Sequence, residues 1–262
     1  TTAGDGSGSA VFGVDLKMDS PSKDWSGESV VEFDLEVENT GQTNETITLT
    51  VNEASGPGCS NAGAITITLS DTSVSVDANE NEFVTVSVEV PEGQEADKYC
   101  WNVDGVVSND PSQGSTDNQD FDLTVPELHE CTMSLSKSSI TVSPGAEGTF
   151  SVIFTNDGNV DWTISVGKFG SKAGWVSVDG ASSGLLEYDD GAGTKTFDLI
   201  VSPDDSIEAG SESLVAIQGK EGSSVKCTKE IRIISGQSHD ASLSLSNSLL
   251  SNIQPDGNGT TT

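Results

Sequence analysis

A pattern of alternating apolar and polar residues, followed by Asn-x-Gly and a second short apolar run, occurs twice in the chain. The first copy consists of Phe33, Leu35, Val37, Asn39, Gly41, Thr46 and Ile47, and the second of Phe150, Val152, Phe154, Asn156, Gly158, Thr163 and Ile164. Each residue of the second copy lies 117 positions after its counterpart, without a gap. Alternation at period two predicts a strand with one buried face. Asn and Gly tolerate the positive φ that tight connections often need, so each copy predicts two neighbouring, paired strands.

Similar short runs continue through the chain and predict strands separated by turn residues. In the first repeat we expect strands at 11–18, 30–38, 46–51, 64–69, 74–76, 82–90, 97–107 and 121–125, with loops at 20–29, 54–63 and 108–119. In the second we expect strands at 132–136, 140–142, 149–155, 162–166, 175–178, 194–201, 213–218 and 225–234. Many short strands with such turns are typical of β-sandwiches. The sequence therefore predicts an all-β protein.

The repeat divides the chain into four parts. These are a flexible lead-in at 1–10, a first sandwich at 11–126, a second at 127–236, and a final part at 237–262. Later in the repeat, Val86, Val88 and Val90 match Phe197, Leu199 and Val201, 111 positions on. The final part resembles the start of the second repeat, because Ala241-Ser-Leu-Ser and Gln254-Pro-Asp-Gly-Asn-Gly-Thr260 are similar to Met133-Ser-Leu-Ser and Ser143-Pro-Gly-Ala-Glu-Gly-Thr149. It is expected to be an incomplete third repeat or an exchangeable C-terminal strand.

The charge is strongly one-sided, with 42 acidic against 11 basic residues and a formal net charge of −31. Such a surface lacks the basic footprint that nucleic acids need, and it disfavours anionic membranes. It favours solubility in a salty environment and diffuse attraction of cations. We expect neither a nucleic-acid partner nor direct membrane insertion of this segment.

Four cysteines fall two to a repeat. One disulfide per domain, Cys59–Cys100 and Cys131–Cys227, is the simplest of the three possible connectivities. Paired cysteines indicate an oxidising compartment, so the protein is expected to be extracellular or at the cell surface.

The turns of the second repeat resemble immunoglobulin-like modules of the CARDB and NEW3 (alpha-galactosidase-associated) kind, found in archaeal and bacterial surface proteins. The matching features are Pro144-Gly145, Asn156-x-Gly158, Gly174-Trp175, Pro203 and Ala209-Gly210. Glu212 stands where the pattern has tyrosine; the first repeat has Tyr99 there but lacks the Gly-Trp pair. The resemblance covers about residues 11–236. It implies tandem sandwiches of seven or eight strands, a connecting or adhesive role, and no catalytic residues.

Two groups of residues are candidates for binding. Acidic turns offer the oxygens that calcium prefers, and the candidates for weak calcium binding are Asn156, Asp157, Asn159, Asp161, Asp189 and Asp190. The alternative is an ordinary Asx-rich turn, since none has EF-hand spacing. Trp25, Trp101, Trp162 and Trp175 are candidates for a sugar-stacking platform; against this, Trp101 and Trp175 are expected to pack in or near the cores, which leaves Trp162 as the candidate for an outward-pointing ring.

The remaining motifs are sparse. His129 and His239 each precede a new repeat and indicate linker positions rather than metal ligands. Asn44-Glu-Thr46 and Asn258-Gly-Thr260 are N-glycosylation sequons in predicted turns. Neither a Gly-x-Ser-x-Gly elbow nor a P-loop occurs in the sequence.

These observations favour a non-enzymatic extracellular protein that needs no cofactor. We expect a subunit of a surface filament, surface layer or stalk that associates with neighbouring copies of itself. Strand addition is one route to such association. A surface glycan or a surface protein is a further candidate partner. The alternative is a carbohydrate-binding accessory module of a secreted glycosidase or protease. An exposed aromatic platform would favour this alternative.

Overall fold

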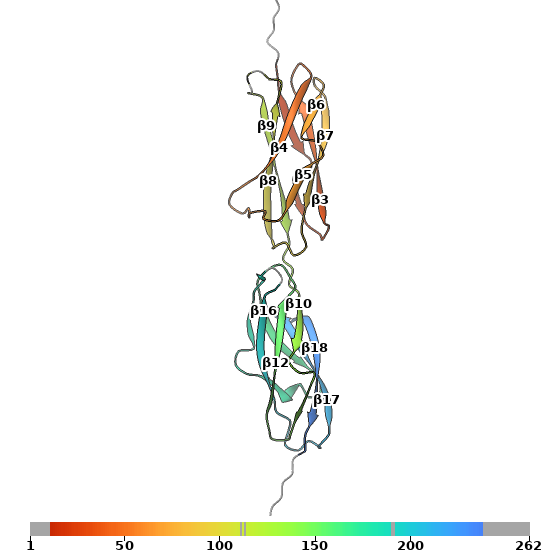
Figure 1. Ribbon diagram of the computed structural model, residues 1–262, viewed down its shortest axis with the longest axis vertical. Coiled ribbons are helices and arrows are strands. Elements are labelled where there is room, and N and C mark those ends of the chain that lie inside the picture. Colours follow the sequence, from red (N-terminus) through yellow and green to blue (C-terminus); the bar gives the residue numbers. More distant parts are fainter. Residues whose placement is uncertain (1–10, 111, 113, 190–191, 238–262) are drawn as a thin grey trace, which may run out of the picture.

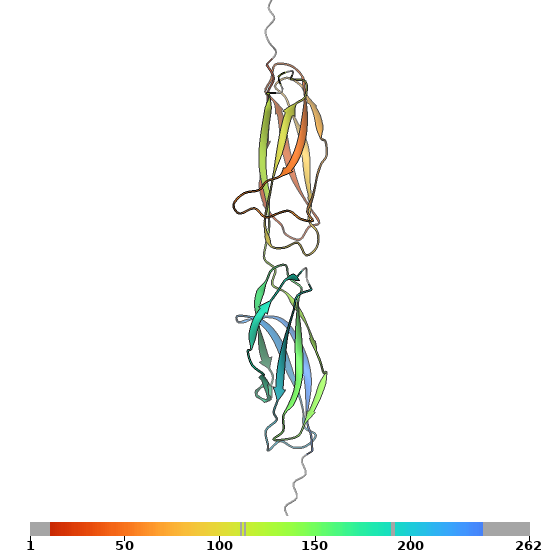
Figure 2. The same cartoon turned by 60° about the vertical axis from the view of Figure 1, so that its left-hand side comes forward.

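The computed structural model describes residues 11–110, 112, 114–189 and 192–237. Two β-sandwiches are stacked end to end along one long axis, and a view turned by 60° shows the same arrangement (Figures 1 and 2). Each sandwich consists of a 4-stranded and a 5-stranded sheet. The fold is all-β and immunoglobulin-like, and η1 (Ala173–Trp175) is a short 3-10 turn in domain 2.

Domain 1 contains nine strands. Its 4-stranded sheet has the order β1 (Val14–Met18), β3 (Val30–Asn39), β7 (Asn81–Glu89), β5 (Thr66–Leu69). Its 5-stranded sheet has the order β2 (Ser22–Asp24), β9 (Thr116–Val125), β8 (Asp97–Val107), β4 (Glu45–Glu53), β6 (Ser73–Val76).

Domain 2 repeats this plan with nine further strands. Its 4-stranded sheet has the order β10 (Cys131–Leu135), β12 (Gly148–Asn156), β16 (Thr194–Val201), β14 (Val176–Val178). Its 5-stranded sheet has the order β11 (Ser139–Val142), β18 (Ser224–Ser235), β17 (Glu212–Glu221), β13 (Trp162–Phe169), β15 (Ser183–Leu186). The resemblance implied seven or eight strands; the difference is due to two short strands that were not expected, β2 in polar sequence and β15 with the sequence Ser-Gly-Leu-Leu.

The alternating residues of the repeat form the two cores, as their pattern predicts. Phe33, Leu35 and Val37 of β3 are buried, and their polar neighbours face outward. The buried residues form two separate clusters, one within 16–125 and the other within 131–233. The segment 126–130 connects them.

The Asn-x-Gly motif does not join paired strands, contrary to expectation. β3 pairs with β1 and β7, whereas β4 pairs with β6 and β8 in the other sheet. The side chain of Asn39 is fully buried where the chain crosses between sheets: Nδ2 donates to the carbonyls of Thr43 and Val76, and Oδ1 accepts from Gly41 N. Asn156 makes the corresponding contacts in domain 2. The motif is therefore a buried strut between sheets.

The glycine of the motif is also required for a reason other than the expected one. Neither Gly41 nor Gly158 has a positive φ. A Cβ on Gly158 would lie 1.8 Å from the carbonyl oxygen of Leu128, so close backbone approach requires glycine here.

Strand register corrects a second detail of the repeat. Val86 pairs with Phe33, and Leu199 pairs with Phe150. The counterpart of Val86 is therefore Leu199 rather than Phe197, an offset of 113 rather than 111 positions. A slip of two residues leaves every side chain on the same face, so the hydrophobic pattern does not detect it.

The long loop expected at 108–119 is shorter than predicted. β9 begins at Thr116, although its first five residues carry only polar side chains. Pairing with β8 over its whole length extends β9 beyond its apolar part.

Candidate functional site

The loops that meet between the two domains form a polar site that joins distant parts of the chain. Asn159 lies at its centre and is 3% exposed. Its Nδ2 donates to the carbonyls of Gln94 (3.1 Å) and Pro126 (3.1 Å), and its Oδ1 accepts from Leu128 N (2.7 Å). Its own carbonyl accepts from Ala96 N (3.0 Å). One side chain therefore links domain 1, the connecting segment and domain 2.

The connecting segment is itself fastened to domain 2. Asp157 N donates to Glu130 O and Asn159 N to Leu128 O, each at 3.1 Å. Gly158 lies between these two bonds and allows the backbones to come together. The linker therefore has little freedom next to domain 2.

A second contact crosses the junction from the end of β15. The hydroxyl of Tyr188 donates to the carbonyl of Gly93, in the loop between β7 and β8 of domain 1. Tyr188 precedes Asp189, whose backbone has a positive φ, and its own N–H donates to Asp161. Sequence reasoning missed Tyr188 and Gln94, because neither belongs to a recognisable motif.

His129 anchors the middle of the linker, in agreement with its predicted linker role. Its ring stacks on Trp162, with a centroid separation of 5.8 Å and an interplanar angle of 4°. Nδ1 lies 2.5 Å from Glu221 and Nε2 lies 3.5 Å from Glu127. Glu221 also pairs with Lys226, and these two contacts lower its pKa. His239 lies outside the described residues.

The N-terminal end of domain 1 repeats the geometry by which the linker is fastened to domain 2. Thr40 N donates to Gly13 O (3.0 Å) and Gln42 N to Val11 O (2.9 Å), as Asp157 and Asn159 do in domain 2. Gln42 thus holds the position of Asn159.

A buried carboxylate distinguishes this end of domain 1. Glu45 is 2% exposed and accepts from Gly13 N at 3.0 Å. Burial raises its pKa, the bond from Gly13 opposes this, and nearby Asp110 adds to the rise. The carboxylate of Asp110 accepts from the hydroxyl and N–H groups of Ser112 and Ser115, which hold its pKa well below the usual range.

The prediction that Trp162 points outward is wrong. It is 4% exposed, and its indole N–H donates to Asn156 Oδ1. Trp101 and Trp175 are buried as expected, and Trp25 is half-buried with its N–H bonded to Glu28 O. The four tryptophans therefore do not form an exposed platform.

The candidate calcium ligands serve mainly as hydrogen-bonding groups of the turns. The amides of Asn156 and Asn159 are committed to the strut and the junction. Asp157 accepts from Thr132 and Asp161 from Tyr188 N, while Asp190 lies outside the described residues. Within the described ranges, His, Cys, Asp and Glu side chains form no group of three or more suited to a metal ion.

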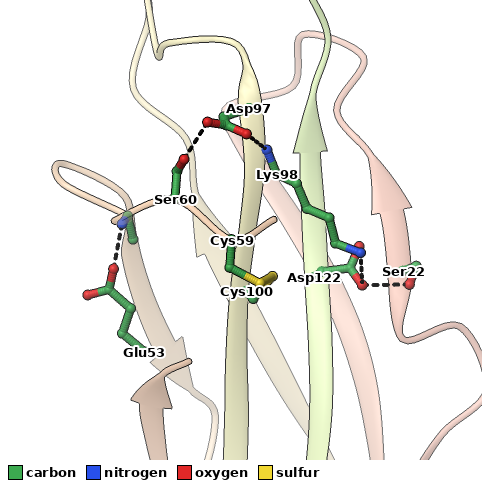
Figure 3. Close-up of a disulfide and its surroundings, with 9 residues drawn as sticks. Ser22, Glu53, Cys59, Ser60, Asp97, Lys98, Cys100 and Asp122 are labelled. Atoms are coloured by element: carbon green, nitrogen blue, oxygen red, sulfur yellow. Dashed lines mark hydrogen bonds and ion pairs between the residues drawn. A yellow bond between two sulfur atoms is a disulfide. The ribbon is translucent and has the colours of Figure 1, made fainter. Parts of the chain in front are cut away.

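Both expected disulfides are formed, and they occupy different places. Cys59–Cys100 ties the loop 54–63 to the outer side of β8, where Ser60 also bonds to Asp97 and Lys98 pairs with Asp122 (Figure 3). Cys131–Cys227 instead joins β10 to β18, which belong to different sheets.

The sequon residue Asn44 is exposed just before β4. Its Oδ1 accepts from Ala78 N at 3.4 Å and its carbonyl from the Asn109 side chain. Asn258 lies outside the described residues.

In the part of the chain that the structure describes, no helix is long and apolar enough to span a membrane. The two disulfides fit an oxidising compartment.

No protein-family model matches the chain, and no curated protein matches it, so the resemblance to CARDB and NEW3 modules stays a prediction. Solved structures are similar at low identity. Domains 4 and 5 of the S-layer protein SbsC are 13% identical, over 70% of this chain and 85% of that one, with a TM-score of 0.31. The CsuC–CsuE chaperone–tip adhesion subunit pre-assembly complex of Acinetobacter baumannii is 14% identical over 86% and 99%, with a TM-score of 0.29. The CupB2 chaperone of Pseudomonas aeruginosa is 13% identical over 83% and 98%, with a TM-score of 0.28. Likeness at this level concerns the fold alone.

Proposed function

We propose that this chain is a non-enzymatic spacer segment of an extracellular or cell-surface protein, such as a filament, surface layer or stalk. Its task would be to hold two immunoglobulin-like domains in a fixed end-to-end orientation. The observation that carries this proposal is the set of bonds around Asn159, which ties the Gln94 loop of domain 1 to domain 2.

The size of the junction energy supports a stiff joint. Three hydrogen bonds between described residues cross directly between the domains, from Asn159, Ala96 and Tyr188. A typical intramolecular hydrogen bond contributes about 0.5–1.5 kcal/mol net; the bond from Asn159 is partly buried and that from Tyr188 is exposed. The linker, which is bonded to domain 2 through Asp157 N and Asn159 N, leaves fewer free residues about which the two domains can reorient.

Other features fit a load-bearing role outside the cell. The disulfides constrain each domain, and the net charge of −31 keeps the surface hydrated. Association with neighbouring copies through a strand from 237–262 belongs to the same proposal, and those residues lie largely outside the described ranges.

Small-angle X-ray scattering tests the spacer function. Wild type should fit a single extended particle, whereas Asn159→Ala should give a shorter average end-to-end distance and a broader distance distribution. Asp157→Ala is the matched control, because Asp157 lies in the same turn, is exposed, and does not contact domain 1 through any described bond. A wild type that is as broadly distributed as Asn159→Ala would contradict a rigid spacer.

A further inference from the structure

The imidazole of His129, in the linker between the domains, lies between two carboxylates. Its Nδ1 is 2.5 Å from Oε1 of Glu221, at the end of β17, and its Nε2 is 3.5 Å from Oε2 of Glu127 in the linker itself. The His129 side chain is 20% exposed, whereas those of Glu221 and Glu127 are 36% and 69% exposed. The contact with Glu221 is therefore the better shielded of the two.

The number of protons on the ring decides how many of these contacts are hydrogen bonds. An ionised carboxylate only accepts hydrogen bonds, so the short contact to Glu221 places a proton on Nδ1. A neutral imidazole has a single N–H, which leaves the lone pair of Nε2 facing the carboxylate of Glu127. A charged imidazole carries a second N–H on Nε2 and donates in both directions. The neutral ring thus satisfies one carboxylate, and the charged ring satisfies both.

Most other groups around the ring also favour its charged form. The carboxylate of Asp161 lines the same surface groove as the ring. The indole of Trp162 lies parallel to it at a centroid separation of 5.8 Å, and an aromatic face attracts a cation within about 6 Å. Partial burial and the amine of Lys226 oppose the charge. That amine is bound 3.2 Å from Oε2 of Glu221, however, which helps to keep the carboxylate ionised.

The ring holds the part of the linker on which the junction depends. Its neighbours Leu128 and Glu130 accept the backbone bonds from Asn159 N and Asp157 N, and Leu128 N donates to the side chain of Asn159. A weaker hold on the ring therefore loosens the same linker residues that position Asn159 beside domain 1.

We propose that His129 is a pH-sensitive clamp, which fastens the linker to domain 2 more tightly when its imidazole is charged. Histidine is the side chain that ordinarily changes its charge between about pH 5 and 8. Docking of the linker is strongest in mildly acidic surroundings and weakens as the pH rises, because the proton that the docked state holds is then lost. The inference rests on the spacer function for its consequence, a joint between the domains that is stiffer in acid.

Domain 1 suggests the matched variant. The backbone bonds that fasten residues 11–13 to domain 1 correspond to those that fasten 128–130 to domain 2, so Phe12 holds the position of His129. Phe12 is partly buried against the core of domain 1. His129→Phe therefore gives domain 2 the ring that domain 1 has at this position, without a titratable group.

Amide hydrogen exchange of the full chain at about pH 5.5 and about pH 8, corrected for the intrinsic pH dependence of exchange, tests the clamp. In wild type the protection of Asp157 N and Asn159 N should be about tenfold higher at the lower pH, since a nearby opposite charge favours a charged group by about tenfold or more. Amides of β12, in the core of domain 2, report any general change in stability. In His129→Phe the two linker-bonded amides should change no more than those of β12. Glu127→Gln, which removes one carboxylate, should give a rise between these limits.

The ¹⁵N chemical shifts of the imidazole give a readout that needs no variant. At about pH 8 they should place the single proton on Nδ1, and at about pH 5.5 they should show protons on both nitrogens. The clamp is overturned by a neutral ring with its proton on Nε2, by wild-type protection that does not rise in acid, or by an equal rise in His129→Phe. The scattering test compares Asn159→Ala with wild type at a single pH, so the clamp and the spacer function can fail separately.

Discussion

Domain 1 has Glu45 at the position where domain 2 has Trp162, at the start of the strand that follows the Asn strut. Both side chains are buried, but Glu45 accepts from the linker-side N–H of Gly13, whereas Trp162 packs against His129 of the linker. The same backbone position thus holds the preceding segment by a hydrogen bond in one domain and by ring stacking in the other.

The seam between the two sheets differs in the same way. In domain 1 the carboxylate of Asp117 on β9 accepts from Leu16 N of β1 at 2.8 Å. In domain 2 the corresponding strands β10 and β18 are joined by Cys131–Cys227. Both domains therefore share the alternating core residues and the buried asparagine, but they differ in the contacts that join their two sheets and that hold the preceding segment.

The outer face of β8 in domain 1 is covered by a loop, whereas the corresponding face of β17 in domain 2 is not. In domain 1 the loop 54–63 lies there, fastened by Cys59–Cys100. Domain 2 lacks this loop, and Phe169 and Leu214 are 70% and 55% exposed at the corresponding place.

The largest expected difference between the domains concerns the disulfides. Removing Cys131–Cys227 by a double Ala substitution should cost about 2–5 kcal/mol of unfolding free energy. Its sequence separation is 96, against 41 for Cys59–Cys100, so the loss should exceed that of the equivalent double variant in domain 1. Hydrogen exchange resolved by domain during chemical denaturation would measure both. Equal losses would show that native contacts, rather than chain constraint, dominate.

The asparagine struts should rank next. Asn156→Ala leaves the buried carbonyl of Leu186 and the indole N–H of Trp162 without their partner, at a cost of about 2–4 kcal/mol. Asn39→Ala should cost somewhat less, because Asn39 has no aromatic donor in its described contacts. Urea unfolding followed by domain-resolved exchange measures both, and a cost below about 1 kcal/mol for either would argue against the strut.

The two glycines of the motif should respond unequally. Gly158→Ala forces Leu128 O away from a Cβ only 1.8 Å distant, which should cost about 1–3 kcal/mol and loosen the linker. In Gly41→Ala the nearest atom is the side-chain oxygen Glu45 Oε1, and the nearest backbone atom, Val11 O, would lie 2.8 Å from the Cβ rather than 1.8 Å, so the cost should be smaller. Thermal unfolding of the two variants checks the order, which the opposite ranking would contradict.

The smallest predicted effect is the pH dependence of domain 1. Because the pKa of Glu45 is raised above 4.5 in the folded state, its contribution to stability is present below that value and is lost as the pH rises through the folded pKa. Glu45→Gln should therefore be more stable than wild type at pH 7 and equal to it near pH 4. The pKa of Asp110 is lowered from its ordinary value of 3.8, so its contribution to stability is lost as the pH falls below that value. Wild type and variant should therefore be compared above pH 4. Urea midpoints at several pH values measure it; a constant difference between wild type and variant would contradict the raised pKa.

The sequence predicted the sandwiches and the repeat, because period-two alternation is visible in each short segment. It predicted the disulfide pairs because each repeat contains two cysteines. It did not predict that the Asn-x-Gly motif crosses between sheets, since alternation reports which face is buried but not which strand lies alongside. The burial of Trp162 was missed because it depends on His129, a residue outside its own strand.

The junction was hidden for a related reason. Asn159 was recognised only as one of several turn oxygens, but its partners Gln94 and Pro126 are backbone carbonyls of distant segments. Every residue has a backbone carbonyl, so the sequence does not indicate which carbonyls accept hydrogen bonds from Asn159; only the three-dimensional structure does. A polar residue that is nine-tenths buried in a turn between domains is the structural signal of such a joint.

Residual dipolar couplings of the wild-type chain in a dilute aligned medium test the rigid junction most directly. Couplings from the strands of both domains should fit one alignment tensor, with the relative orientation seen in Figure 1. In Asn159→Asp, which loses the donors to Gln94 and Pro126 but keeps the acceptor for Leu128 N, the two domains should require tensors of different magnitude. Two different tensors in wild type, or one shared tensor that Asn159→Asp leaves unchanged, would contradict the role of Asn159 in fixing the domains.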